Sequence, residues 1–160
     1  MVQFGGVDHV GFSVKDLARS VTFYTEVLGF VEIMDVGYAR LMMHPQTGFV
    51  LGVSRHEGAR GEPFTELATG LDHLGLTAGS REELEEWERV FDEHGVEYTP
   101  IRDMEFGFHL NFRDPDGIAL ELFAPGPLAL AARDALSRSA AKDDVAAFVA
   151  EHMGPDLVPR

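Results

Sequence analysis

The sequence predicts an α+β fold in which two tandem βαβββ modules are followed by a C-terminal helical tail. The first observation is a repeat: "VDHVGF" at positions 7–12 returns as "LDHLGL" at 71–76. The second is the order of strand and helix patterns, which is the same after each copy. The third is the change to an alanine-rich composition after residue 125. Two strand histidines in matching frames therefore indicate a duplicated unit.

The first module covers about residues 5–54. Apolar and polar residues alternate over 6–14, which is typical of a half-buried strand. Asp16 then begins a helix with apolar residues at helical spacing, and Gly29 ends it. Three short β-like runs follow at 30–36, 38–44 and 48–54, separated by turn signals. A glycine-rich connection at 55–69 has no clear period and links this module to the next.

The second module covers about residues 70–125 and begins with a strand at 70–78. Ser80 and Glu83 form a capping box that opens a helix ending at Gly95. The remaining strands are expected at 96–104, 107–114 and 117–125, with "DPDG" as the turn between the last two. Residues 1–125 are thus expected to form one domain. The extension 126–160 reads as one or two helices that pack on this domain or on a partner subunit.

Composition restricts the class of protein. Hydrophobic residues make up 45% and charged residues 25% of the 160 residues, which is ordinary for a globular protein. No apolar run approaches the ~20 residues of a membrane span, and the start lacks a signal-peptide pattern, so we expect a cytoplasmic protein without a membrane partner. The absence of cysteine excludes disulfides and thiolate ligands. The formal charge of −14 disfavours nucleic acid as a partner.

Two segments resemble a known family. "DHVGFSVKDLARSVTFYTEVLGF" and "FRDPDGIALELFAP" are similar to the vicinal oxygen chelate superfamily, which includes glyoxalase I, extradiol dioxygenases, fosfomycin resistance enzymes and bleomycin resistance proteins. The resemblance covers roughly residues 5–125. It implies a glyoxalase-like fold, in which the modules pair their sheets into a cupped incomplete barrel, and a homodimer. It leaves the reaction open, because one fold carries many chemistries.

The resemblance also implies a divalent metal held by His9, His73 and Glu121. The fourth ligand position of the family's isomerases falls on Gly52 in this chain. Two imidazoles and one carboxylate leave positions open for substrate and O2, so Fe(II) is favoured, with Mn(II) or Zn(II) as alternatives.

Strand alternation gives independent support for the carboxylate ligand. Glu121 lies between Leu120 and Leu122 and therefore points to the other face of its strand. A carboxylate directed into an enclosed sheet needs a cation or hydrogen bonds. Asp8 and Asp72 also match across the repeat, and we interpret them as strand-end residues that point away from the histidines.

Other residues are expected to line the cavity. An imidazole can give or take a proton near neutral pH, so His109 is the candidate catalytic acid or base, the alternative being a cross-strand hydrogen bond. Asn111 stands where extradiol dioxygenases carry a tyrosine. The repeat places Met42 opposite Asn111 and Arg40 opposite His109, so Arg40 either clamps a substrate oxygen or pairs with an acidic neighbour. Phe123 contributes to an aromatic wall for the substrate.

We favour a metal-dependent enzyme that acts on a small oxygenated molecule chelating the metal, with a dioxygenase-type oxidoreductase ahead of the others. One alternative is a metal-free protein that binds an antibiotic or another small molecule, as bleomycin resistance proteins do. A further alternative is a Mn or Zn lyase, isomerase or transferase. Fosfomycin enzymes fit the three-ligand set, but Gly11 stands where their thiol transferases resemble one another in having threonine.

Overall fold

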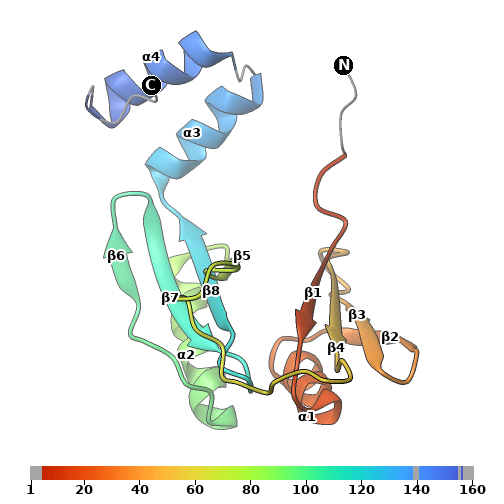
Figure 1. Cartoon of the computed structure of the whole chain (residues 1–160). Helices are drawn as coiled ribbons and strands as arrows, with labels where there is room; N and C mark the ends of the chain where they lie inside the picture. Colours follow the sequence, from red (N-terminus) through yellow and green to blue (C-terminus); the bar gives the residue numbers. More distant parts are fainter. Residues whose placement is uncertain (1–4, 139–140, 155, 157–160) are drawn as a thin grey trace. The chain divides into compact units, whose positions relative to one another are not determined.

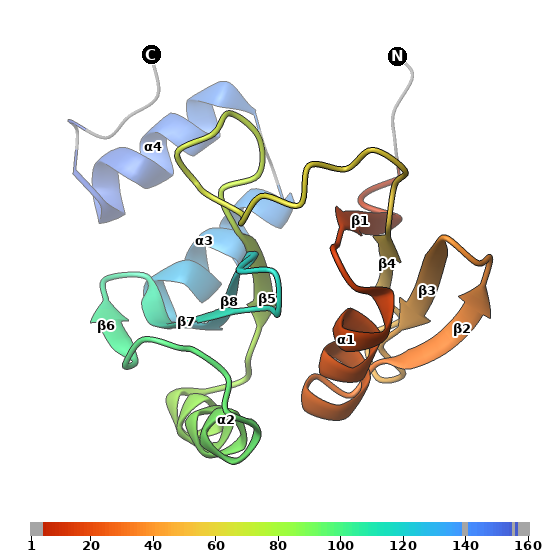
Figure 2. The ribbon, with the colours of Figure 1, turned by 60° about the horizontal axis from the view of Figure 1, so that its bottom comes forward.

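The computed structural model describes residues 5–138, 141–154 and 156 and contains two four-stranded sheets (Figures 1 and 2). In the first sheet the strand order is β1 (His9–Ser13), β4 (Val50–Ser54), β3 (Ala39–Met43) and β2 (Val31–Asp35). In the second sheet it is β5 (Leu74–Thr77), β8 (Ala119–Pro125), β7 (Gly107–Arg113) and β6 (Arg102–Met104). The two orders correspond strand for strand, so the predicted duplication and the glyoxalase-like fold class are confirmed.

The helix of the first module supplies much of the core of the first sheet. It runs as α1 (Leu17–Thr22) and continues as a π-helical segment, η1 (Phe23–Val27). The predicted cap is present, because the Arg19 backbone N–H donates to Asp16 Oδ1 over 3.1 Å. Helix α1 packs on β3 and β4. Tyr24 is 1% exposed and meets Phe23 and Phe30 edge to face.

The helix of the second module is α2 (Arg81–His94), and both side chains of the predicted capping box bond to backbone N–H groups at its start, Glu83 to that of Gly79 rather than to that of the N-cap residue Ser80. Ser80 Oγ accepts a hydrogen bond from the Glu83 backbone N–H over 3.2 Å. The Glu83 carboxylate reaches back and accepts from the backbone N–H of Gly79 over 2.7 Å. Leu84 and Phe91, two of the apolar residues at helical spacing, are fully buried.

Two strand boundaries of the second module differ from the prediction. Strand β5 begins at Leu74 rather than at 70, so His73 lies directly before the strand instead of inside it. The segment expected as a strand over 96–104 forms only an isolated bridge from Tyr98 to Phe112 and then the short β6. Pro100 lies between these two pieces, and a proline cannot donate a ladder hydrogen bond.

The turn between β7 and β8 is organised by a buried carboxylate. Asp114 is 5% exposed, and its Oδ1 accepts from the backbone N–H groups of Asp116 and Ile118 over 2.8 Å each. Its Oδ2 accepts from the Tyr24 hydroxyl over 3.0 Å. Burial raises the pKa of Asp114 and raises the pKa of Tyr24 well above the usual range. The turn is thereby joined to the helix of the first module.

The C-terminal tail is helical, as expected, and forms α3 (Pro127–Arg138) and α4 (Lys142–His152), which contact each other. Figure 1 shows α3 following directly on β8. Within the described ranges, every helix is too short or too polar to span a bilayer.

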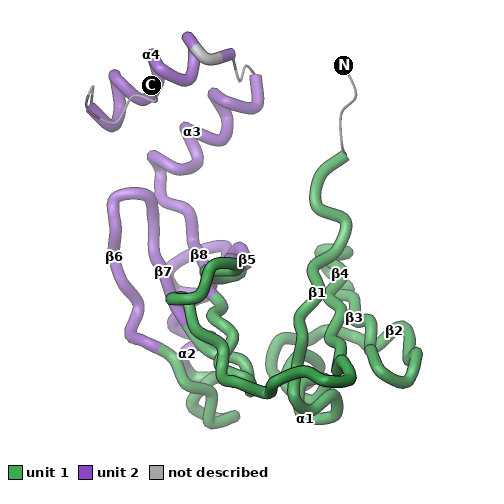
Figure 3. Tube along the Cα trace, viewed as in Figure 1, with its two compact units in different colours: residues 1–74, 89–98, 112–120 green, residues 75–88, 99–111, 121–160 purple. Residues whose placement is uncertain are grey.

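The chain forms two compact units (Figure 3). One holds the residues up to 74 together with 89–98 and 112–120, and the other holds 75–88, 99–111 and 121–160. His9 and His73 belong to the first unit, whereas Glu121, His109 and Asn111 belong to the second.

Candidate functional site

Glu121 is held by a hydrogen-bond network on one face of the second sheet. Its side chain is only 12% exposed, and His109 Nδ1 lies 2.8 Å from its Oε2. The Asn111 amide nitrogen lies 3.2 Å from the same oxygen when the amide oxygen accepts from Arg102 Nη2 over 2.7 Å. Arg102 of β6 and His109 of β7 lie directly opposite each other in the antiparallel register of these strands. His109 therefore makes a cross-strand hydrogen bond, the alternative given for it, and Asn111 bonds to the same carboxylate.

The second oxygen of Glu121 faces strand β5. A Cβ atom placed on Gly75 would lie 3.9 Å from Glu121 Oε1, so this oxygen sits over a position that has no side chain. Strand β5 is the neighbour of β8 in the sheet, and His73 directly precedes β5. A partly buried carboxylate therefore has one oxygen taken by two donors and the other directed toward the strand that follows His73.

Each candidate histidine is held by the aspartate before it. His9 Nδ1 lies 2.9 Å from Asp8 Oδ2, and His73 Nδ1 lies 2.6 Å from Asp72 Oδ1. The prediction that these aspartates point away from the histidines is therefore wrong. Because a carboxylate accepts but does not donate, Nδ1 carries the proton, and in the neutral imidazole Nε2 then has the free lone pair. Metal-binding histidines commonly have this arrangement, and the repeated Asp-His pair was the sequence signal for it.

Phe123 lies on the same side of β8 as Glu121. Its ring centroid is 4.8 Å from that of His109, and the Arg133 guanidinium carbon is 5.9 Å from the Phe123 ring centroid. Arg133 comes from α3. The C-terminal extension therefore brings a cation beside an aromatic ring that adjoins the candidate site, which the sequence pattern had not indicated.

Arg40 and Met42 do not share the face of His9, contrary to the expectation. Gly52 pairs with Gly11 on one side and with Leu41 on the other, so Leu41 lies on the face of Gly11 and His9. Met42 is 0% exposed on the opposite face. The match between the two modules was wrong by one residue in β3. The turn from His44 to Phe49, which is closed by a hydrogen bond from the His44 N–H to the Phe49 carbonyl, is one residue longer than the corresponding turn from Asp114 to Ile118.

Arg40 is engaged in ion pairs. Its Nε lies 3.3 Å from Glu32 Oε1 and its Nη1 lies 2.6 Å from Asp35 Oδ1. We expect Arg40→Ala to lower the free energy of unfolding by about 1 kcal/mol, because partly exposed ion pairs contribute little. Substrate turnover should be unchanged. Urea unfolding and steady-state kinetics on the same preparation measure the two effects. A large rise in KM would indicate that Arg40 binds the substrate after all.

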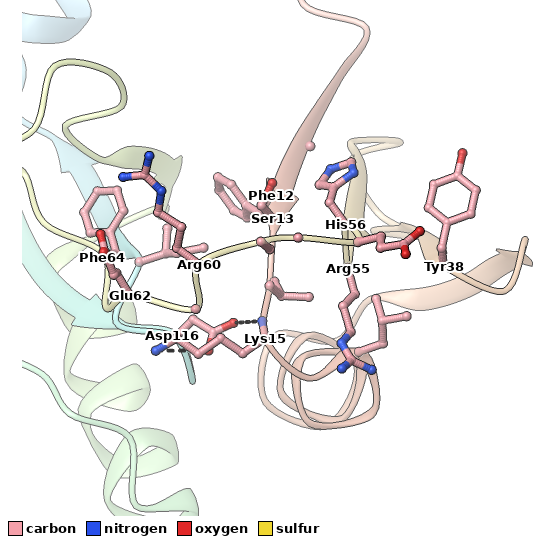
Figure 4. A pocket seen from close by; sticks show the side chains of 18 of the residues that line it. Phe12, Ser13, Lys15, Tyr38, Arg55, His56, Arg60, Glu62, Phe64 and Asp116 are labelled. Atoms are coloured by element: carbon pink, nitrogen blue, oxygen red, sulfur yellow. Dashed lines mark hydrogen bonds and ion pairs between the residues drawn. The ribbon is translucent and has the colours of Figure 1, made fainter.

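A pocket of about 1160 Å³ lies in the first unit and is shown in Figure 4. Its lining includes Gly11 and Ser13 of β1 and residues 55–62 of the connection, but none of the candidate metal ligands. Arg55 and Arg60 leave the connection in different directions in this view. The two guanidinium groups therefore do not converge on one ligand group, and the pocket does not by itself identify a substrate.

The donor set is suited to a divalent metal. Two imidazoles that present Nε2 and one carboxylate oxygen match the preferences of Mn(II), Fe(II) and Zn(II). In the part of the chain that the structure describes, no group of three His, Cys, Asp or Glu side chains is close enough to hold a metal ion. The ligand set His9, His73 and Glu121 therefore stays a prediction.

Comparisons with known proteins agree with the fold. The sequence profile of the Glyoxalase/Bleomycin resistance protein/Dioxygenase superfamily matches residues 6–122. Metallothiol transferase FosB from Staphylococcus haemolyticus is 28% identical over 122 residues, which are 73% of this chain and 81% of the relative.

Solved structures give the same result. The glyoxylase/bleomycin resistance protein/dioxygenase domain from Frankia sp. EAN1pec is 32% identical with a TM-score of 0.71, covering 78% of this chain and 100% of that chain. FosX from Listeria monocytogenes, solved with Mn(II) and a sulfate ion, is 21% identical with a TM-score of 0.63, covering 85% and 98%. The match covers most of this sequence, and the chain belongs to the Glyoxalase/Bleomycin resistance protein/Dioxygenase superfamily.

Proposed function

We propose that the protein is a metal-dependent enzyme that acts on a small oxygenated molecule, with His9, His73 and Glu121 as metal ligands. The observation that carries this proposal is the partly buried Glu121 carboxylate, which has one oxygen fixed by donors and the other directed toward the strand after His73. The Asp8 and Asp72 partners of the histidines support it, because they leave both Nε2 atoms available.

A transferase is now favoured over the dioxygenase expected from the ligand count. The support is the similarity to a relative named metallothiol transferase. A divalent metal, when bound, would polarise a substrate oxygen and so make the neighbouring carbon more reactive toward a nucleophile. We propose Mn(II) or Zn(II) for this reaction. The dioxygenase-type reaction with Fe(II) stays the second candidate, since the three-ligand set leaves positions for O2.

The chain's own residues have separate tasks in this proposal. His109 donates from Nδ1 to Glu121, so its Nε2 can accept or return a proton during turnover. Phe123 packs against the His109 ring and supplies an apolar wall. Asn111 keeps its amide on the carboxylate and on Arg102. We further propose a homodimer, to be checked by light scattering.

The decisive test is metal analysis of protein purified anaerobically without an affinity tag, followed by assays with thiols and electrophilic oxygenated molecules. Thiol consumption that needs Mn(II) or Zn(II) and is lost in His73→Ala would support the transferase. Oxygen uptake that needs Fe(II) would support the dioxygenase. Protein that binds none of the three metals, yet binds ligands in the presence of a chelator, would instead be a metal-free binding protein.

A further inference from the structure

We infer that His109, Asn111 and Arg102 are positioning residues that fix the Glu121 carboxylate so that Oε1 is its metal-binding oxygen. The inference rests on the proposed metal site and assigns these three side chains a role in building it.

The first step concerns Glu121 Oε2. A carboxylate oxygen has two lone-pair directions in the plane of the group. His109 Nδ1 at 2.8 Å and the Asn111 amide nitrogen at 3.2 Å supply two donors to this one oxygen. Because His109 and Glu121 are 20% and 12% exposed, water competes only weakly for these bonds. Oε2 is therefore occupied before any metal arrives.

The second step concerns the orientation of the Asn111 amide. An amide can present either its oxygen or its nitrogen to Glu121, and only the nitrogen can donate. Arg102 Nη2 lies 2.7 Å from the amide oxygen, and a guanidinium only donates. Arg102 therefore holds the oxygen on its own side and directs the nitrogen to the carboxylate. Its effect on Glu121 passes through Asn111.

The third step concerns Oε1. Within the described residues, this oxygen has no hydrogen-bond donor, and it lies over Gly75, where a Cβ would be 3.9 Å away. The glycine has an ordinary strand conformation and no close neighbour other than this oxygen, so it leaves the space beside Oε1 open. Glu121 is thereby prepared to bind through a single oxygen.

The test is the dissociation constant for Mn(II), followed by electron paramagnetic resonance of the free ion, in the full chain and in single variants. Asn111→Ala, His109→Ala and Arg102→Ala are each expected to bind roughly 10–100-fold more weakly, as for other residues that support metal ligands. His109→Asn keeps a donor near the Nδ1 position and is expected to bind within a few-fold of the parent. Asp103→Ala, on the neighbouring residue of β6, is the matched control and should not change the affinity.

The outcomes are distinguishable. Unchanged Mn(II) affinity in both His109→Ala and Asn111→Ala, with the parent binding normally, would overturn the positioning role and leave the metal site standing. A parent chain that binds no Mn(II) would overturn both. Thermal unfolding of each variant identifies those that fail to fold. Mn(II) binding by His109→Asn close to that of the parent would support the donor role, and equally poor Mn(II) binding by His109→Asn and His109→Ala would count against it.

Discussion

Glu121→Gln is expected to reduce bound divalent metal from about one ion per chain to background. The substitution keeps the size of the side chain but removes the carboxylate, the one anionic donor of the proposed set. Loss of a residue that only supports a ligand weakens metal binding by roughly 10–100-fold, so loss of the ligand itself should exceed about 100-fold. Elemental analysis after dialysis, together with Mn(II) titration, measures this directly.

The glutamine variant is preferred to alanine because it preserves packing beside His109 and Asn111. Glu121→Ala serves as a second variant, since it leaves both donors without an acceptor. Glu105→Gln, in the turn between β6 and β7, is the matched control for a change of charge. Full metal content in Glu121→Gln would remove Glu121 from the ligand set and, with it, the observation on which the proposed function depends.

Much of the architecture could be predicted because the chain repeats its local signals. Asp16 and Ser80 both cap helices as expected, and the strand order of one sheet recurs in the other. These features depend on interactions between residues close together in the sequence, so the local pattern of residues predicts them. The helical tail followed from composition and spacing in the same way.

The face assignment of β3 failed for a different reason. Side chains alternate along a strand, so an error of one residue moves every side chain to the opposite face. The turn after β3 is one residue longer than the turn after β7. Counting residues back from Gly52 as one counts back from Glu121 therefore matched Asn111 with Met42, whereas the structure places Leu41 at that position. Turn length depends on how the loop closes, which the repeat alone did not reveal.

The hydrogen-bond partners of the candidate ligands could be predicted only in part from the sequence. Asp8 and Asp72 were visible as a repeat, but strand alternation suggested the wrong direction because Asp8 precedes β1, and Asp72 and His73 both precede β5, so alternation does not apply to these pairs. Arg102 was missed because its link to Glu121 passes through Asn111, and such indirect contacts leave no spacing in the sequence. The reaction is harder still to predict from the sequence, because proteins of one fold carry out different reactions through differences in a few side chains.

Asp114→Ala is expected to lower the free energy of unfolding by about 3 kcal/mol or more. The buried carboxylate accepts from the Tyr24 hydroxyl and from two backbone N–H groups, and alanine would leave all three donors without this acceptor. Tyr24→Phe removes one of these bonds and should cost about 1–2 kcal/mol. Urea unfolding monitored by circular dichroism gives both values, and equal stability of parent and Asp114→Ala would contradict the structural role of the turn.

The same carboxyl should make stability depend on pH. Burial raises the pKa of Asp114 in the folded protein, so the folded state keeps this proton to a higher pH than the unfolded state does. The folded state therefore binds more protons between the two pKa values, and the free energy of unfolding falls as pH rises through that interval. Asp114→Asn has the same shape and no titration. The difference in stability between the parent and Asp114→Asn should shift in favour of the variant as pH rises from about 4, and a difference that stays constant between pH 4 and pH 8 would show that ionisation of Asp114 costs the fold nothing.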